Sequence, residues 1–527
     1  MTFIQPIAEV AAAFGLTSDQ YDLHGPHRAK IHLDANANLP PGRGRYVLVT
    51  ATTPTVTGIG KTVTAIGLAM GLSRLGHRSA VALRESALGP TLGAKGGGAG
   101  GGAAQIVPLD ECLLDLGDTT AVSAATNLLA AVVDDTLHRN GGIDATTVTW
   151  RRVLDVDDRS LRQVIVGLGG RTNGPLRETG FDITAASEVM ALLALSRDRA
   201  DLRARLDALV PAWDSEGKPV TAGRLRAAGA MAVLLRTALQ PNLLQTSEGT
   251  TALVHAGPFG NLSLGSSSVL ADLIALPRVD FLVTEAGFGA DLGAEKFFHL
   301  KCPASDEYPD VAVLVTTVPS MREQGGTANL CHHIGVLRAF GVPVVVAINA
   351  FPGDSTEEIA LLKRASLEAG AAAVAEHQAF SRGGDGCVEL AEAVVSHSRS
   401  PVPGRHAIYA SSDSARQKVH LLATKVYGAA DVAWEPTAQQ ALERFVEAGY
   451  GQLPVCIAKT HLSLSHDPAL RGAPTGFTLP VREVRLAAGA GYLSVLTGAV
   501  ATMPGLPAHP RLLDLDLDPD GTVLGLT

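Results

Sequence analysis

The sequence YVLVTATTPTVTGIGKTVTAIGLAMG, residues 46–71, carries the clearest structural pattern in this chain. Residues 46–51 form an apolar, β-branched run, which predicts a buried strand. A turn-forming stretch with glycines at Gly58 and Gly60 follows, and apolar residues recur at helical spacing from Lys61 onward. The pattern therefore predicts a strand, a loop and a helix in succession.

The start of this predicted helix has the residues of a phosphate site. Backbone N–H groups of a loop and of a helix N-terminus attract anions, Lys61 adds a positive charge, and the Thr62 hydroxyl can reach a Mg²⁺ ion. The strict pattern GxxxxGK[ST] has glycine where this chain has Thr55, so an ordinary strand-to-helix turn is the alternative. We expect a nucleotide to be bound by Thr53, Thr55, Gly58, Gly60, Lys61 and Thr62.

Composition limits the classes of function. The chain has 527 residues, too many for one hydrophobic core, so several domains are expected. With 46% hydrophobic and 18% charged residues it reads as globular. Only 4% of residues are aromatic and the net charge is −9, which argues against a nucleic-acid surface.

Cysteine usage and the N-terminus point to the cytoplasm. The five cysteines include no CxxC pair, which favours a reducing compartment over disulfides or a zinc site. The run Cys331-His332-His333 resembles metal ligands, but adjacent histidines on a helix point in different directions. No window reaches 18 uninterrupted apolar residues, so no membrane segment is predicted.

Two later segments favour a ligand site beside the phosphate loop. The predicted strand 79–83 ends at Arg84 and Glu85, where parallel sheets bind ligands, so Arg84 is a candidate phosphate or carboxylate contact. The alternative is a surface ion pair between these two residues. Residues 89–104, GPTLGAKGGGAGGGAA, read either as a flexible linker or as backbone that passes close to a ligand or to another backbone.

The remaining pattern predicts an α/β protein. Predicted strands at 164–167, 280–285, 311–315 and 342–349 alternate with predicted helices at 121–135, from 185 onward, and at 198–209. Thr184 is the expected N-cap of the second of these helices. Such alternation predicts a parallel sheet covered by helices, with smaller domains appended after about residue 401.

Long motifs run along almost the whole chain. They are the TPT…GxGKT loop at 53–62, LRE at 83–85, KGGGAGGG at 95–102, GFDIT at 180–184, VTEAGFGADLGAEKF at 283–297, VPVVVAIN at 342–349, LPVCIAKT at 453–460, PTGF at 474–477 and TMPGLP at 502–507. Together these motifs resemble those of the formate–tetrahydrofolate ligase family.

The resemblance implies a P-loop NTPase-like parallel sheet core with two smaller α/β domains. The implied division is a nucleotide-binding and acyl-phosphate domain at 1–345, a pterin-pocket domain at 346–425 and a C-terminal domain at 426–527, in a homotetramer. It also implies ATP-dependent ligation of formate to nitrogen 10 of tetrahydrofolate through formyl phosphate, with Mg²⁺ and a monovalent cation (K⁺ or NH₄⁺) as cofactors.

The resemblance assigns roles to individual residues. The implied catalytic residues are Lys61, Arg84 and Thr184, and the implied acyl-phosphate contacts are Arg84, Lys95, Gly97 and Gly98. Mg²⁺ is expected at Thr62 through ATP, and the monovalent cation at Glu85. The pterin ring is expected between Phe288, Phe351, Pro352 and Phe380, where Phe380 replaces a tryptophan of the family and can still stack.

The chain also departs from the family pattern. Ile59 replaces a glutamate, which predicts the loss of a carboxylate beside the metal; Pro319 and Ala350 replace arginines; Ala103 replaces a tyrosine. Histidines are missing within 114–122 and 264–268. Two alternatives therefore remain: a paralogue that uses another carboxylate or amine, and a catalytically silent ATP-binding regulatory protein.

Overall fold

The architecture is built outward from β3 (Arg45–Ala51), which confirms the strand predicted at 46–51. The structure is a computed structural model, and it describes residues 4–39, 42–55, 58–93, 98–398 and 407–526. The predicted helix from Lys61 is also confirmed, as α2 (Lys61–Arg74).

Strand β3 is apolar at most of its positions, and from Tyr46 to Ala51 both of its faces are buried. Tyr46 and Leu48 belong to one hydrophobic cluster, whereas Val47 and Val49 belong to a second cluster on the opposite face. Successive side chains of a strand point to opposite faces, so a strand covered on both sides needs apolar residues at every position.

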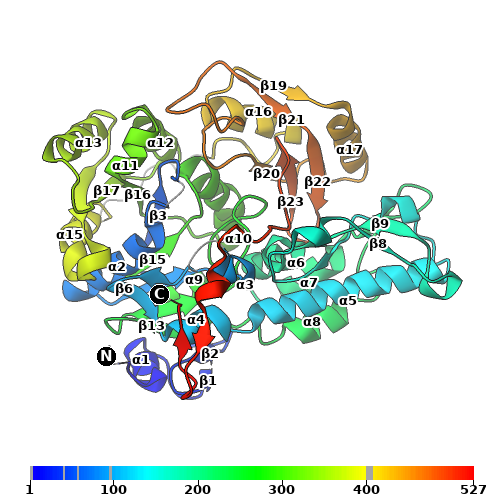
Figure 1. The fold of residues 1–527 in the computed structure, drawn as a ribbon, viewed down its shortest axis with the longest axis horizontal. Helices are drawn as coiled ribbons and strands as arrows, with labels where there is room; N and C mark the ends of the chain where they lie inside the picture. The colour runs from blue at the N-terminus through cyan, green and yellow to red at the C-terminus, as the bar shows by residue number, and fades with distance from the viewer. Residues whose placement is uncertain (1–3, 40–41, 56–57, 94–97, 399–406, 527) are drawn as a thin grey trace.

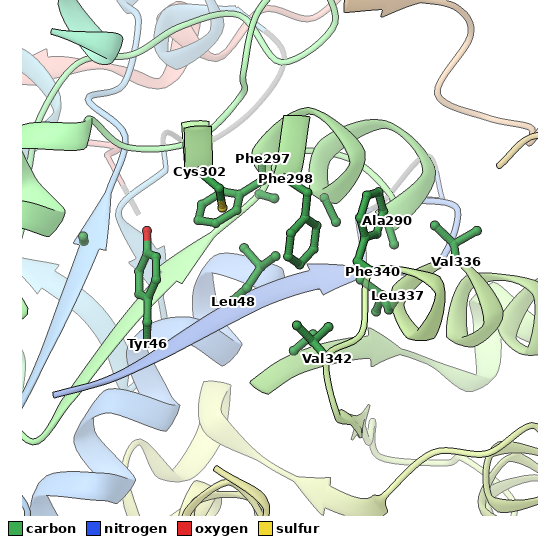
Figure 2. Close-up of a cluster of buried hydrophobic side chains, with 14 of the residues drawn as sticks. Tyr46, Leu48, Ala290, Phe297, Phe298, Cys302, Val336, Leu337, Phe340 and Val342 are labelled. Carbon is green, nitrogen blue, oxygen red and sulfur yellow. The ribbon is translucent and has the colours of Figure 1, made fainter. Parts of the chain in front are cut away.

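Figure 2 shows the first of these clusters. Tyr46 and Leu48 lie beneath Phe297 and Phe298, which belong to a π-helical segment, η6 (Phe297–Lys301). Phe298 stacks on Phe340 with ring centroids 4.3 Å apart. Aromatic packing of this kind fixes the helices that follow the carboxyl end of the sheet against β3.

The chain forms a mixed α/β structure with a large, mostly parallel central sheet. Its main path, in spatial order, is β1 (Tyr21–Leu23), β2 (Ala29–Ile31), β13 (Asn242–Thr246), β14 (Thr251–Val254), β4 (Ser79–Leu83), β15 (Phe281–Glu285), β3, β16 (Val311–Thr316), β17 (Val344–Asn349) and β18 (Ala373–His377). Every neighbouring pair from β14 to β18 is parallel. The predicted parallel sheet is thus confirmed for this part, and β13 is the strand at which the direction reverses.

Helices cover both sides of the sheet and extend beyond it (Figure 1). They are α1 (Ile7–Ala13), α3 (Leu88–Leu92), α4 (Leu109–Leu114), α5 (Asp118–His138), α6 (Glu188–Leu195), α7 (Arg199–Ala208), α8 (Ala228–Leu235), α9 (Val269–Ala275), η5 (Ala290–Ala294), α10 (Cys302–Ser305), α11 (Val318–Glu323), α12 (Ala328–Ala339), α13 (Thr356–Glu368), α14 (Ala379–Arg382), α15 (Val388–His397), α16 (Ala415–Lys425) and α17 (Pro436–Glu447). One helical stretch, Leu109–His138, has the length and composition of a membrane span, but 50% of its apolar window is buried within the protein.

The remaining strands pair either beside the main path of the central sheet or in small sheets of their own. They are β5 (Gly100–Gly101) with β6 (Ala104–Val107), β7 (Arg152–Val153) with β10 (Phe181–Asp182), β8 (Val164–Val166) with β9 (Arg177–Thr179), β11 (Ala212–Trp213) with β12 (Pro219–Val220), β19 (Asp431–Trp434) with β21 (Thr478–Val481), β20 (Val455–Ala458) and β22 (Glu483–Ala487) with β23 (Tyr492–Leu496), and β24 (Asp516–Leu517) with β25 (Val523–Leu524). β6 also pairs with β13 and so joins the central sheet.

Two local predictions need correction. Thr184 is not the cap of the following helix: it lies in a 3₁₀ turn, η4 (Thr184–Ala186), and Ser187 Oγ accepts the N–H of Met190 at the start of α6. The predicted strand at 164–167 forms an antiparallel hairpin apart from the main sheet, because its residues are at most half-buried and need no second covering layer.

The proposed domain boundaries stay a prediction. The division at 345 falls inside β17, and β17 and β18 pair in register with the same sheet as β16. Helices α16 and α17 and strands β19 to β23 gather on one side of the sheet (Figure 1). A buried ion pair, Lys459 Nζ to Asp291 Oδ2 at 2.7 Å, ties this part to the segment after β15.

Candidate active site at the carboxyl edge of the sheet

The predicted site residues follow neighbouring parallel strands. Arg84 follows β4, Glu285 ends β15, the phosphate loop follows β3, and Phe351 and Phe380 follow β17 and β18. Ligands of open α/β sheets bind outside this edge. The sheet therefore brings together residues that are up to about 330 positions apart.

Two glycines of the phosphate loop are required by its conformation. Gly58 and Gly60 have φ values of 84° and 83°, in the left-handed region. An added Cβ at Gly60 would lie 2.6 Å from Asn349 Nδ2, which donates a hydrogen bond to the Ile59 carbonyl at 3.1 Å. Asn349, at the end of β17, therefore holds the loop from the neighbouring strand.

The two loop threonines shape the loop. The Thr53 hydroxyl lies 2.8 Å from Asn329 Nδ2, which donates to it, and 3.1 Å from His333 Nε2. Thr55 Oγ1 donates to the Gly58 carbonyl at 3.1 Å. Burial lowers the pKa of His333 to about 4, so its ring is neutral at physiological pH.

Lys61 and Thr62 begin α2 directly after the loop, as predicted. Thr62 Oγ1 donates a hydrogen bond of 2.8 Å to Glu285 Oε2. Ile59, in contrast, is 1% exposed and packs in the hydrophobic core. Position 59 thus offers no oxygen toward the loop, and the predicted loss of a carboxylate beside the metal stays a prediction.

Arg84 lies near Glu285, the residue that accepts the hydrogen bond from Thr62. Its Nη2 lies 3.9 Å from Glu285 Oε1, its Nη1 donates to the Pro258 carbonyl at 3.4 Å, and its buried Nε has no partner in the described part of the chain. No ion pair between Arg84 and Glu85 is recorded among the described residues. A buried donor without a partner fits an anionic ligand, since most buried donors are hydrogen-bonded.

Glu85 belongs to a separate buried polar cluster. Its Oε1 accepts the N–H and the hydroxyl of Thr119 at 3.3 and 3.0 Å, and its Oε2 has no partner among the described residues. Burial, together with the charge of Asp118, raises the pKa of Glu85 to about 8, while Lys30 opposes the shift. Lys30 Nζ lies 2.7 Å from both carboxylate oxygens of Asp118.

The glycine-rich segment contacts backbone where it is described. Lys95 and Gly97, expected at the acyl phosphate, lie outside the described residues. Gly98 N–H donates to Ser86 Oγ at 2.8 Å. An added Cβ at Gly102 would lie 2.2 Å from the Phe380 carbonyl, so the second glycine triplet allows a close approach of two backbones.

Thr184 is fully buried in this structure. Its Oγ1 lies 2.7 Å from Ser123 Oγ of α5, and its carbonyl accepts the Ser187 hydroxyl. Its predicted contact with the acyl phosphate stays a prediction.

The expected pterin residues form two groups. Phe351 and Phe380 are 44% and 60% exposed, Pro352 is exposed beside Phe351, and the strands that precede them are paired, with Asn349 opposite His377. Exposed aromatic rings at a ligand edge suit a planar heterocycle. Phe288 instead stacks on His461, with ring centroids 4.9 Å apart. The backbone φ of Phe288 is 60°, which is unusual for a residue other than glycine.

The described residues contain no group of three or more histidine, cysteine or carboxylate side chains arranged to hold a metal. The rings of His332 and His333 diverge, since His332 Nε2 lies 2.7 Å from the Val426 carbonyl whereas His333 faces Thr53. A Mg²⁺ ion needs fewer protein ligands, because it is held by one or two carboxylates with substrate phosphates and waters.

Two residues with buried polar contacts near the candidate site were not singled out from the sequence. Glu285 lies at the end of a predicted strand, in VTEAGFG, and this position was its only signal. Lys30 gave no pattern that marks it in the sequence, because its partner Asp118 lies 88 residues away.

Comparison with known proteins gives a consistent result. A sequence model of the formate–tetrahydrofolate ligase family matches residues 2–527. The formate–tetrahydrofolate ligase of Roseiflexus sp. strain RS-1 is 51% identical, over 99% of this chain and 98% of the relative. Those of Saccharopolyspora erythraea and Chloroflexus aurantiacus are each 49% identical, over 100% and 99% of this chain and 98% of each relative.

Proposed function

Since this chain belongs to the formate–tetrahydrofolate ligase family, we propose that it uses ATP to join formate to nitrogen 10 of tetrahydrofolate. The structural observation that supports this most is that Thr62, Glu285 and Arg84 lie together at one edge of the sheet. One bound ATP can therefore contact the phosphate loop while its γ-phosphate lies close to a formate bound by Arg84.

The reaction proceeds in two steps. A formate oxygen attacks the γ-phosphorus of ATP, the bond from that phosphorus to ADP breaks, and formyl phosphate forms. The tetrahydrofolate nitrogen then attacks the formyl carbon, phosphate leaves with the electrons of the C–O bond, and the nitrogen loses its proton. Phosphoryl transfer depends mainly on positioning and charge neutralisation rather than on covalent help from the protein.

The residues of the chain have separate roles in this scheme. Lys61, Thr62 and the N–H groups near Gly58 and Gly60 bind the ATP phosphates. The planar guanidinium of Arg84 binds formate and then the acyl phosphate, with Lys95, Gly97 and Gly98, and Thr184 contributes from the GFDIT segment.

The pterin ring binds between Phe351-Pro352 and Phe380, with Phe288 nearby. Thr62 would hold Mg²⁺ together with the ATP phosphates, and the ion would supply neutralisation of the phosphate charge. The unpartnered Glu85 Oε2 is a fitting oxygen for a monovalent cation. We further propose a P-loop NTPase-like core, three domains divided near 345 and 425, a homotetramer and a cytoplasmic location.

The two alternative functions are less favoured. A paralogue with another carboxylate or amine, and a silent ATP-binding regulator, were motivated by departures such as Ile59 and Ala350. Relatives of about half identity over the whole chain carry the ligase name. The unpartnered buried Nε of Arg84 also suits a small carboxylate ligand, which a regulator would not need to bind.

The direct test is to mix the protein with MgATP, potassium, formate and tetrahydrofolate, and to measure 10-formyltetrahydrofolate after acid conversion to its methenyl form. We expect product, and a rate lower by about 100-fold or more in Lys61→Ala, because a charge on the transferred phosphoryl group is lost. Lys363→Ala, which removes a lysine paired with Glu376 at the surface, is the control that keeps the rate. If ATP binds but no product forms, the ligase assignment is wrong and other carboxylates should be screened.

A further inference from the structure

Glu285 is a buried carboxylate between the phosphate loop and Arg84. It is 3% exposed and ends β15, the strand that lies between β4 and β3. Its Oε2 accepts the hydrogen bond from Thr62, and its Oε1 is 3.9 Å from Arg84 Nη2, beyond hydrogen-bond distance. Among the described residues these are its recorded partners.

This environment is sparse for a buried carboxylate. A carboxylate has about four acceptor positions, and a buried charge normally needs a full set of partners. The single hydrogen bond and the long ion pair leave capacity at Oε1. The carboxylate therefore suits a cation that arrives with a ligand.

The neighbours of Glu285 indicate which cation. A threonine hydroxyl and a carboxylate are hard oxygen ligands, and Mg²⁺ is usually bound by one or two carboxylates together with substrate phosphates. Thr62 lies in the first turn of α2, directly after the loop where the phosphates are expected. The same pairing, a hydroxyl at the helix start with an acidic residue at the end of an adjacent strand, holds Mg²⁺ in nucleotide-hydrolysing proteins.

We propose that Glu285, together with Thr62, holds the divalent cation that accompanies ATP. The assignment rests on the proposed function, because the cation needs a nucleotide on the phosphate loop. It adds a residue that neither the sequence motifs nor the relatives' names assigned.

A consequence follows for Arg84. With no cation, the carboxylate of Glu285 is the nearest negative charge to the guanidinium. A cation on Glu285 offsets that charge, so Arg84 is freed to bind an anion, and a nucleotide with Mg²⁺ should strengthen the binding of formate. Such coupling is reciprocal, so formate should strengthen the binding of the metal nucleotide to the same extent.

The experiment measures ADP affinity by titration calorimetry, once with Mg²⁺ and once with EDTA. The wild-type protein is expected to bind ADP more tightly with Mg²⁺. Glu285→Gln keeps the shape and can still accept the Thr62 hydroxyl, so it should bind ADP with EDTA as well as wild type does. The affinity of this variant for ADP in the presence of Mg²⁺ should be about 10- to 100-fold lower than that of wild type, the usual loss when a group that supports a bound metal is replaced.

A matched control and a second probe make the result specific. Glu376→Gln removes a carboxylate near the end of β18, where it pairs with Lys363 at the surface, and should keep the full Mg²⁺-dependent gain. The electron paramagnetic resonance signal of Mn²⁺ bound with ADP should change in Glu285→Gln and persist in Glu285→Asp, which retains a carboxylate.

The outcomes separate this assignment from the proposed function. If Glu285→Gln keeps the full gain and an unchanged Mn²⁺ signal, Glu285 does not hold the cation. If Glu285→Gln does not fold, Thr62→Val takes its place as the test variant. A full Mg²⁺-dependent gain in ADP affinity in Thr62→Val then also contradicts the assignment. If wild-type protein binds no ADP with or without metal, the proposed function itself is overturned.

Discussion

Two glutamates at neighbouring strand ends have different environments. Glu285 faces the phosphate loop through Thr62, whereas Glu85, two residues past β4, faces Thr119 and the Lys30–Asp118 pair. Burial raises the pKa of Glu85 to about 8, so this carboxyl group is protonated at neutral pH when no cation is bound. A difference of two residues relative to the strand end therefore separates a carboxylate suited to a divalent cation from a carboxyl group whose charge depends on pH.

This shift predicts a pH dependence of stability. Unfolded Glu85 releases its proton near 4.5 and folded Glu85 near 8, so between these values the folded state binds more protons. The free energy of unfolding should therefore fall as pH rises through this window, and Glu85→Gln should remove that contribution. Urea unfolding from about pH 5 to about pH 8.5, without potassium, measures the difference.

Potassium gives an internal check on the same residue. A cation that binds the ionised carboxylate should lessen the decline of the wild-type protein at the upper end of the window and leave Glu85→Gln unaffected. Parallel curves for wild type and variant at every pH would contradict the assignment. Glu376→Gln is the surface control.

At the scale of elements, the glycine-rich hairpin supports the turn that carries Phe380. Ala103 N–H donates to the Phe380 carbonyl at 2.8 Å, and Gly102 lies against the same carbonyl with a φ of 60°. The β5–β6 hairpin pairs with β13 through β6. The second glycine triplet is thus explained by contact between backbones, one of the two interpretations of the sequence.

Gly102→Ala should disturb this support. The added Cβ would lie 2.2 Å from a backbone oxygen and would also require a left-handed alanine, at a cost of about 1–3 kcal/mol. Thermal stability should fall, and tetrahydrofolate should bind more weakly because Phe380 shifts. Gly335→Ala, in α12 with no atom within 4 Å of the added Cβ, should be neutral or slightly stabilising. Equal effects of the two substitutions would refute this role of the hairpin.

At the scale of the whole molecule, the end of the chain returns to the large sheet. The C-terminal strap, residues 502–526, begins with the Thr502 carbonyl accepting the Ile183 N–H at 2.8 Å. Further along, Arg511 N–H donates to the Gly93 carbonyl at 2.8 Å, and Leu526 is buried in the cluster that contains Ala104. Figure 1 shows β24 and β25 beside α3 and α4, far from the strands that precede them in sequence. The strap thereby connects two segments that flank the candidate site.

Leu526→Ala should loosen this connection. Removing a buried leucine side chain costs about 2–5 kcal/mol where the cavity does not collapse. We expect faster amide hydrogen exchange in α3 and β6, with little change in α13 at the other edge of the sheet. Leu513→Ala, on the same strap but 68% exposed, is the matched control. Exchange that rises equally in both variants, or in neither, would argue against a packing role for Leu526.

The sequence by itself determined much of this protein. Apolar runs with β-branched residues gave the strands β3, β4, β15, β16 and β17, and helical spacing after Lys61 gave α2, because each of these patterns is local. Turn-forming residues indicated the loop between β3 and α2, and the order of strands and helices implied a parallel sheet. Long motifs carried the family resemblance.

Only the tertiary structure decided which side chains meet. Thr62 and Glu285 are 223 residues apart, and the Thr53 hydroxyl is held from 276 residues away by Asn329. The inward turn of Ile59, the cap at Ser187 instead of Thr184, and the return of the C-terminal strap likewise depend on what packs against each segment. A local pattern specifies a strand or a helix, but a contact between distant residues is set by the spatial order of the strands in the sheet.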